Sequence, residues 1–65
     1  MTLTLATEKK GNLEVALEYE KFGALYARVY EEWGGEWHKT NESRPYKDEK
    51  KAKASFRRFV KKYLA

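Results

Sequence analysis

The chain has 65 residues, which allows one small domain over residues 1–65 and excludes a multidomain architecture. It contains no cysteine and one histidine, so disulfides, thiolate metal sites and multi-histidine metal sites are excluded. No apolar run approaches the ~18 residues of a membrane span and the start of the chain lacks signal-peptide character, so we expect no membrane partner and a cytoplasmic location.

Charge is distributed unevenly along the chain, whose formal net charge is +4. Residues 1–46 contain six Lys or Arg and eight Glu, a net charge of −2. Residues 47–65 contain eight Lys or Arg and two acidic residues, a net charge of +6. The basic partner surface, if the chain has one, must therefore lie in the last third of the sequence.

The first half of the chain predicts a hairpin. Residues 2–8 (TLTLATE) and 12–20 (NLEVALEYE) both alternate apolar and polar side chains, which is typical of half-buried antiparallel strands. A three-residue loop at 9–11 ending in glycine would align their apolar faces. The expected core pairs are Leu5–Val15 and Leu3–Leu17.

A similar loop, residues 21–23, leads into a third strand at 24–33 (ALYARVYEEW). A three-residue loop there would place the second strand between the first and the third. It would also align the apolar side chains of the third strand with those of the second. The expected pairs are Tyr19–Leu25, Leu17–Ala27 and Val15–Val29.

A fourth strand at about 36–41 should follow the Gly34-Gly35 turn. A two-residue loop would pair Trp33 with Glu36 and place Trp37 on the outer face of the sheet. A three-residue loop would place Trp37 on the core face instead. In both registers the strand is polar, as suits the edge of a sheet.

The segment 48–64 (DEKKAKASFRRFVKKYL) predicts one amphipathic helix with Asp48 as its N-cap. One helical stripe carries its apolar residues, Ala52, Phe56, Phe59, Val60 and Tyr63. The expected fold is therefore α+β: a four-stranded, or at least three-stranded, antiparallel β-meander with one C-terminal amphipathic helix packed on one face.

The helix opens with the run Tyr46-Lys-Asp-Glu-Lys-Lys-Ala52-Lys-Ala-Ser-Phe56, preceded by a sheet. Over residues 24–60 this order resembles AP2-type domains and the arm-binding domains of phage integrases. The resemblance implies a sheet followed by a packed helix. Those families place basic and aromatic sheet residues in DNA, whereas this sheet is acidic, so their mode of binding is not carried over.

Catalytic and metal sites receive little support, and we expect no enzyme activity, no cofactor, no metal and no small-molecule substrate. His38 falls on the polar edge strand, which is typical of an exposed residue. Glu14, Glu18 and Glu20 line one strand face, but strand residues two apart are separated by about 6.5–7 Å, which is loose for a single cation.

The basic side of the helix carries the strongest functional signal. Neighbours at i,i+4 repel one another, as in Lys53 and Arg57, and a polyanion would relieve this repulsion. We expect nucleic acid phosphates as the partner, with an acidic protein or an ordinary solvated surface as alternatives. The candidate nucleic-acid-binding residues are Lys50, Lys51, Lys53, Arg57, Arg58, Lys61 and Lys62.

A second candidate surface lies on the outer face of the sheet. Its aromatic and basic side chains would suit a protein partner or self-association into a homodimer. Single-stranded nucleic acid is disfavoured there, because glutamates share the face. The candidate protein-interface residues are Tyr26, Arg28, Tyr30 and Trp37.

Overall fold

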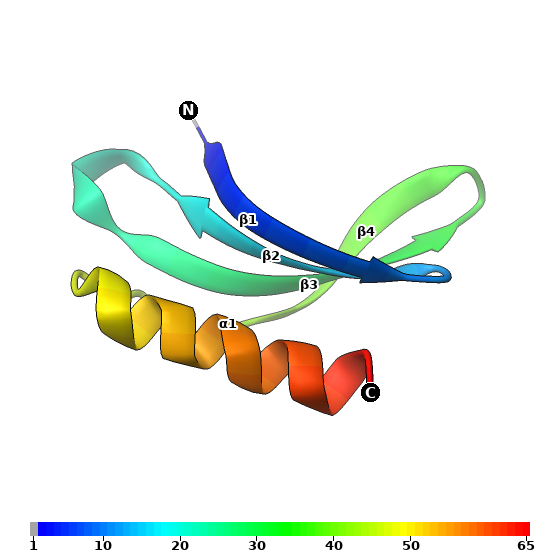
Figure 1. Ribbon diagram of the computed structural model, residues 1–65. Coiled ribbons are helices and arrows are strands. Elements are labelled where there is room, and N and C mark those ends of the chain that lie inside the picture. Colours follow the sequence, from blue (N-terminus) through cyan, green and yellow to red (C-terminus); the bar gives the residue numbers. More distant parts are fainter. Residues whose placement is uncertain (1) are drawn as a thin grey trace.

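The protein folds as four antiparallel strands in one open sheet, with a single C-terminal helix packed on one face (Figure 1). The structure, a computed structural model, describes residues 2–65. The strands lie side by side in sequence order, which confirms the predicted α+β meander. The elements are β1 (Leu3–Lys10), β2 (Leu13–Tyr19), β3 (Leu25–Trp33), β4 (Glu36–Glu42) and α1 (Glu49–Tyr63), with a short 3-10 turn at Lys21–Gly23.

The first hairpin differs from the prediction in its loop and its register. The loop has two residues, Gly11 and Asn12, and Lys10 pairs with Leu13. Gly11 has a φ of 61°, and a positive φ at the first position of a two-residue loop suits the twist of antiparallel strands. The shorter loop lets both strands continue closer to the turn than expected.

A bulge between Thr4 and Ala6 moves the register of β1 again. The predicted pairs Leu5–Val15 and Leu3–Leu17 are therefore wrong. Leu3 and Leu5 stay 57% and 47% exposed, outside the packed centre of the sheet. The observed pairs at these positions are Glu8–Val15, Ala6–Leu17 and Leu3–Tyr19.

The second hairpin confirms the predicted register, with Leu17 opposite Ala27 and Val15 opposite Val29. The Glu20 amide donates to the Ala24 carbonyl at 2.8 Å and closes the three-residue loop. The last loop residue, Gly23, has a φ of 76°, as the turn type requires.

The third hairpin settles the open position of Trp37. Gly34 and Gly35 form a two-residue loop, both with positive φ, and Trp33 pairs with Glu36. Trp37 pairs with Glu32 and therefore lies on the outer face, away from the helix.

The helix begins as the sequence predicts. The Asp48 side chain accepts a hydrogen bond from the Lys50 amide at 2.9 Å and caps the first turn. Before it, the backbone of Tyr46 exchanges two hydrogen bonds with Leu25 of β3, at 2.7 and 2.8 Å. This bridge fixes where the chain crosses under the sheet to start α1.

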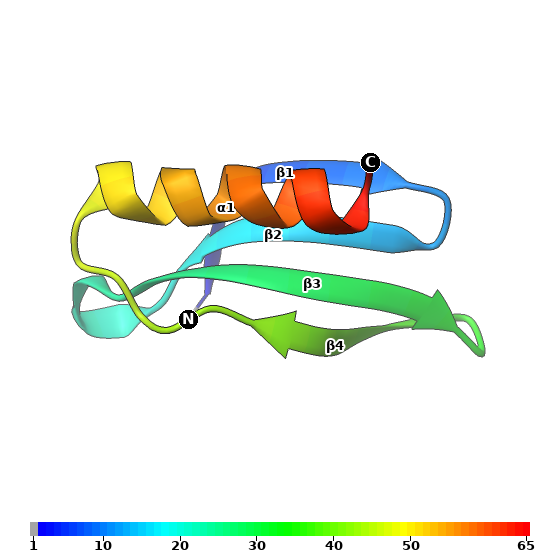
Figure 2. The ribbon, with the colours of Figure 1, turned by 90° about the horizontal axis from the view of Figure 1, so that it is seen from below.

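The core lies between α1 and the two central strands. Ala52 is fully buried against Leu17 and Leu25, and Phe56 packs against both halves of the core. The helix runs alongside the strands on this face (Figure 2), so its opposite side looks away from the sheet. No helix within residues 2–65 is long and apolar enough to cross a membrane.

Candidate functional site

The outward side of α1 is covered by cationic side chains. All seven predicted residues are exposed, and they cover the flanks and the outward side of the helix, outside its packed stripe. We call this surface the basic face; it consists of Lys50, Lys51, Lys53, Arg57, Arg58, Lys61 and Lys62.

The basic face keeps most of its charge uncompensated. Among residues 2–65, its one ion pair joins Lys53 Nζ to Glu49 Oε2 at 2.9 Å, and both side chains are largely exposed. Lys62 Nζ also lies 5.4 Å from the centre of the Tyr63 ring. No sheet glutamate within residues 2–65 forms an ion pair with a residue of the basic face.

Helical geometry divides the basic face into two sides. At 100° per residue, Lys53 and Arg57 project toward β1, and both line a hollow shared with that strand. Lys51, Arg58 and Lys62 project toward the other flank of the helix. The two sides can therefore be changed independently by mutation.

The outer face of the sheet is organised around Arg28. Its guanidinium Nη1 contacts Glu18 at 2.9 Å and Glu20 at 2.7 Å, and its Nε contacts Glu42 at 2.6 Å. The Arg28 side chain is 11% exposed and that of Glu18 is 10% exposed, so this pair is nearly buried. We call Arg28 and these three carboxylates the Arg28 cluster.

Two tyrosines contact the Arg28 cluster. The Tyr30 hydroxyl donates to Glu18 Oε1 at 2.6 Å, and the Arg28 guanidinium lies 4.3 Å from the centre of the Tyr26 ring. Burial raises the pKa of Tyr30 to about 12, and the hydrogen bond to Glu18 adds to this effect. Tyr26, Arg28 and Tyr30 are thus brought together as predicted, but the Arg28 charge is committed to glutamates of the same chain.

Trp37 lies apart from this cluster. Lys9 Nζ sits 4.8 Å from the centre of the Trp37 ring, which links β1 to β4 across the outer face. His38 is stacked on Trp33 with ring centres 3.8 Å apart, and its Nε2 lies 3.2 Å from the Trp33 carbonyl oxygen. The imidazole is therefore held by its hairpin.

The carboxylates of the outer face do not form a metal site. Within the described residues, no group of three or more His, Asp or Glu side chains is arranged to hold a metal ion. Glu18, Glu20 and Glu42 converge, but the guanidinium of Arg28 occupies the position that a cation would take.

Sequence reasoning did not include Glu42 in the outer-face cluster. Its carboxylate also accepts a hydrogen bond from Lys39 Nζ at 3.0 Å. The hydrogen bonds from Lys39 and then from Arg28 lower the pKa of Glu42. Glu42 lies opposite Arg28 because the pairing of β3 and β4 shifts its register between Val29 and Tyr30. No pattern in the sequence predicts this shift.

Comparisons with protein-family models, with curated proteins and with solved structures found no match to this chain.

Proposed function

We propose that the protein binds nucleic acid by contacting phosphates with the basic face of α1. The observation that carries this proposal is the exposure of seven cations on one helix with a single internal ion pair among residues 2–65. Concentrated, uncompensated positive charge is the usual footprint of a phosphate-binding surface.

The charge arrangement has an energetic cost without a partner. Like charges stand at i,i+4 in three pairs, and each costs about 0.2–0.5 kcal/mol in an isolated helix. The pairs are Lys53–Arg57, Arg57–Lys61 and Arg58–Lys62. Only the first of these includes a residue that is also paired with an acid, Glu49. A polyanion would turn this repulsion into attraction.

The size of the basic face suits a short stretch of backbone. Lys50 and Lys62 are twelve residues apart, which corresponds to about 18 Å along the helix axis. That distance spans about five nucleotide steps at about 3.4 Å per step. Lysine and arginine on a helix flank would hold phosphates with little discrimination between bases.

The outer face of the sheet supports nucleic-acid binding less well. Arg28 contacts three carboxylates, so it offers no net positive charge to a phosphate. Tyr26 and Tyr30 are partly buried, which leaves little ring surface for base stacking.

Salt dependence tests the proposal. If four to six phosphates are contacted, the logarithm of the affinity for duplex DNA should fall with a slope of about −3.6 to −5.4 against log salt. Anisotropy of a labelled duplex and of a labelled single strand, between about 50 and 200 mM salt, would measure these slopes.

Neutralising three cations on one side of the helix gives the sharpest variant. Changing Lys51, Arg58 and Lys62 to Gln should reduce the duplex slope by up to about 2.7, since each lost phosphate contact removes about 0.9. The matched control changes Lys9, Lys10 and Lys21 to Gln, which removes the same charge from β1 and the second loop. Equal losses in both variants, or binding without salt dependence, would contradict the proposal.

A further inference from the structure

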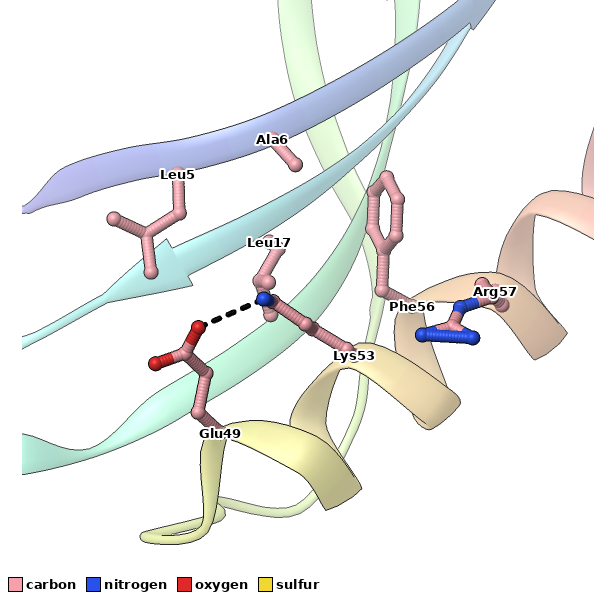
Figure 3. Close-up of a pocket in the computed structure, with 7 residues that line it drawn as sticks. All are labelled: Leu5, Ala6, Leu17, Glu49, Lys53, Phe56 and Arg57. Carbon is pink, nitrogen blue, oxygen red and sulfur yellow. Dashed lines mark ion pairs between the residues drawn. The ribbon is translucent and has the colours of Figure 1, made fainter.

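A groove separates the edge strand β1 from α1. It has a volume of about 480 Å³, and Figure 3 shows its lining side chains converging from the strand and the helix. Its apolar floor consists of Leu5, Ala6, Leu17 and Phe56, and its rim carries Glu49, Lys53 and Arg57. We call this feature the β1–α1 groove.

The groove exists because the helix packs on the central strands. α1 lies against β2 and β3, and β1 curves away from it (Figure 1). The bulge at Thr4–Ala6 turns Leu5 and Ala6 toward the gap. Leu5 is 47% exposed there, so apolar surface is left uncovered beside the core.

The same strand has an unused hydrogen-bonding edge. β1 is bonded to β2 on one side, and no segment of residues 2–65 pairs with its other side. Eight residues of extended backbone, about 27 Å in length, therefore present amide and carbonyl groups beside the groove. Such an edge accepts an added strand.

The rim of the groove sets a charge preference. Lys53 is already paired with Glu49, whereas Arg57 makes no ion pair within residues 2–65. Arg57 lines the groove from the helical turn after Lys53 (Figure 3). An acidic side chain in the groove would meet Arg57 with its charge uncompensated.

We propose that the β1–α1 groove binds an extended, acidic peptide segment of a partner protein by strand addition to β1. Alternate side chains of an added strand point to the same face, about 6.8 Å apart. An apolar side chain at one position would cover the floor formed by Leu5 and Phe56. The acidic side chain two positions along would reach Arg57, so the recognised pattern is apolar–any–acidic. This site overlaps the nucleic-acid surface at Lys53 and Arg57, which belong to both, whereas its apolar floor belongs to the groove alone.

A palindromic probe peptide tests the proposal without assuming a strand direction. The probe is an acetylated and amidated pentapeptide, glutamate–threonine–leucine–threonine–glutamate. Titrated into the labelled protein, it should shift the amide resonances of β1 and of the Lys53 to Arg57 turn, with a dissociation constant below about 1 mM. One control peptide has lysine in place of both glutamates, and another has serine in place of leucine; both should bind at least about tenfold more weakly.

Paired variants separate this site from the basic face. Arg57→Gln should weaken probe binding about twofold to fivefold, whereas Arg58→Gln should leave it unchanged. Both variants should weaken nucleic-acid binding to a similar degree, because each removes one exposed cation of the same helix. Leu5→Glu should abolish probe binding, and Leu3→Glu, on the same strand but outside the groove lining, should not.

Three results would overturn the proposal. The first is the absence of β1 shifts with the probe at about 5 mM, well above the expected dissociation constant. The second is equal binding of the lysine control. The third is concentration-dependent dimerisation in sedimentation that occupies β1, which would assign the edge to a second copy of the chain. None of these results bears on the salt dependence of nucleic-acid binding, so the two proposals fail separately.

Discussion

Replacing Arg28 with methionine should strongly destabilise the fold. Methionine keeps an unbranched stem for packing but removes the charge that three carboxylates share. Glu18 suffers most, because its side chain is 10% exposed and would retain only the Tyr30 hydroxyl as a partner. Glu20 and Glu42 are more exposed and can regain water.

The size of the effect follows from this burial. Removing one partner of a buried ion pair costs about 3–5 kcal/mol, and the residual exposure of the pair favours the lower end, about 3 kcal/mol. A chain of 65 residues has a free energy of unfolding of about 3–10 kcal/mol, so this loss is a large fraction of the total. Urea denaturation followed by tryptophan fluorescence would measure it.

A second change tests the assigned cause. Glu18→Gln combined with Arg28→Met removes the stranded charge and should recover at least about 1 kcal/mol relative to Arg28→Met alone. If Arg28→Met costs less than about 1 kcal/mol, or the double variant recovers nothing, then Glu18 is not held by Arg28 and the reasoning is refuted.

Three further predictions concern other parts of the fold. The pKa of Glu20 is lowered by hydrogen bonds from Arg28 and then Thr2, and that of Glu42 by Lys39 and then Arg28. Because the folded values lie below the unfolded value of about 4.3, the free energy of unfolding should be constant above about pH 6 and fall below about pH 5. Changing both residues to Gln should flatten that fall in acid denaturation curves, and an unchanged fall would assign it to other carboxylates. Phe22 has a φ of 67° and is 88% exposed, so Phe22→Asn should raise the free energy of unfolding by about 0.5–1 kcal/mol in urea melts. A loss of stability there would reveal a packing role for the ring. Asp48→Ala should cost about 1 kcal/mol by removing the helix cap, whereas Asp48→Asn should cost little; equal costs would rule out capping as the cause.

The sequence was sufficient for the elements whose local signals agree. The loop at Lys21–Gly23 ends in a glycine with positive φ, and the register that this loop sets pairs Leu17 with Ala27. The turn residues and the apolar pattern therefore predicted the same strand register. The cap at Asp48 and the stripe around Ala52 were likewise predicted correctly.

The first hairpin was mispredicted for two reasons. Lys9-Lys10-Gly11 imitates a three-residue loop, but the turn forms one residue later at Gly11-Asn12. The bulge beside Leu5 then changes which residues face the core, and bulges have no strong sequence signature. The bulge also changed the surface of the protein. The β1–α1 groove is lined in part by residues that were expected in the core, Leu5 among them.

The outer face illustrates a second limit. Composition indicated both the glutamates and Arg28, but not that Glu18, Glu20 and Glu42 would meet one guanidinium. That convergence depends on the pairing of three strands, including the shifted register of β4. By contrast, the outward charge of α1 was predictable, because helical periodicity alone separates the basic residues from the apolar stripe.

The most direct test of the central claim is a residue-level map of the nucleic-acid contact surface. A short DNA duplex titrated into the isotope-labelled protein at about 50 mM salt should shift resonances along the outward side of α1, from Lys50 to Lys62, and leave Tyr26 and Tyr30 on the outer face unchanged. Shifts concentrated on the outer face of the sheet, with α1 unaffected, would contradict the account.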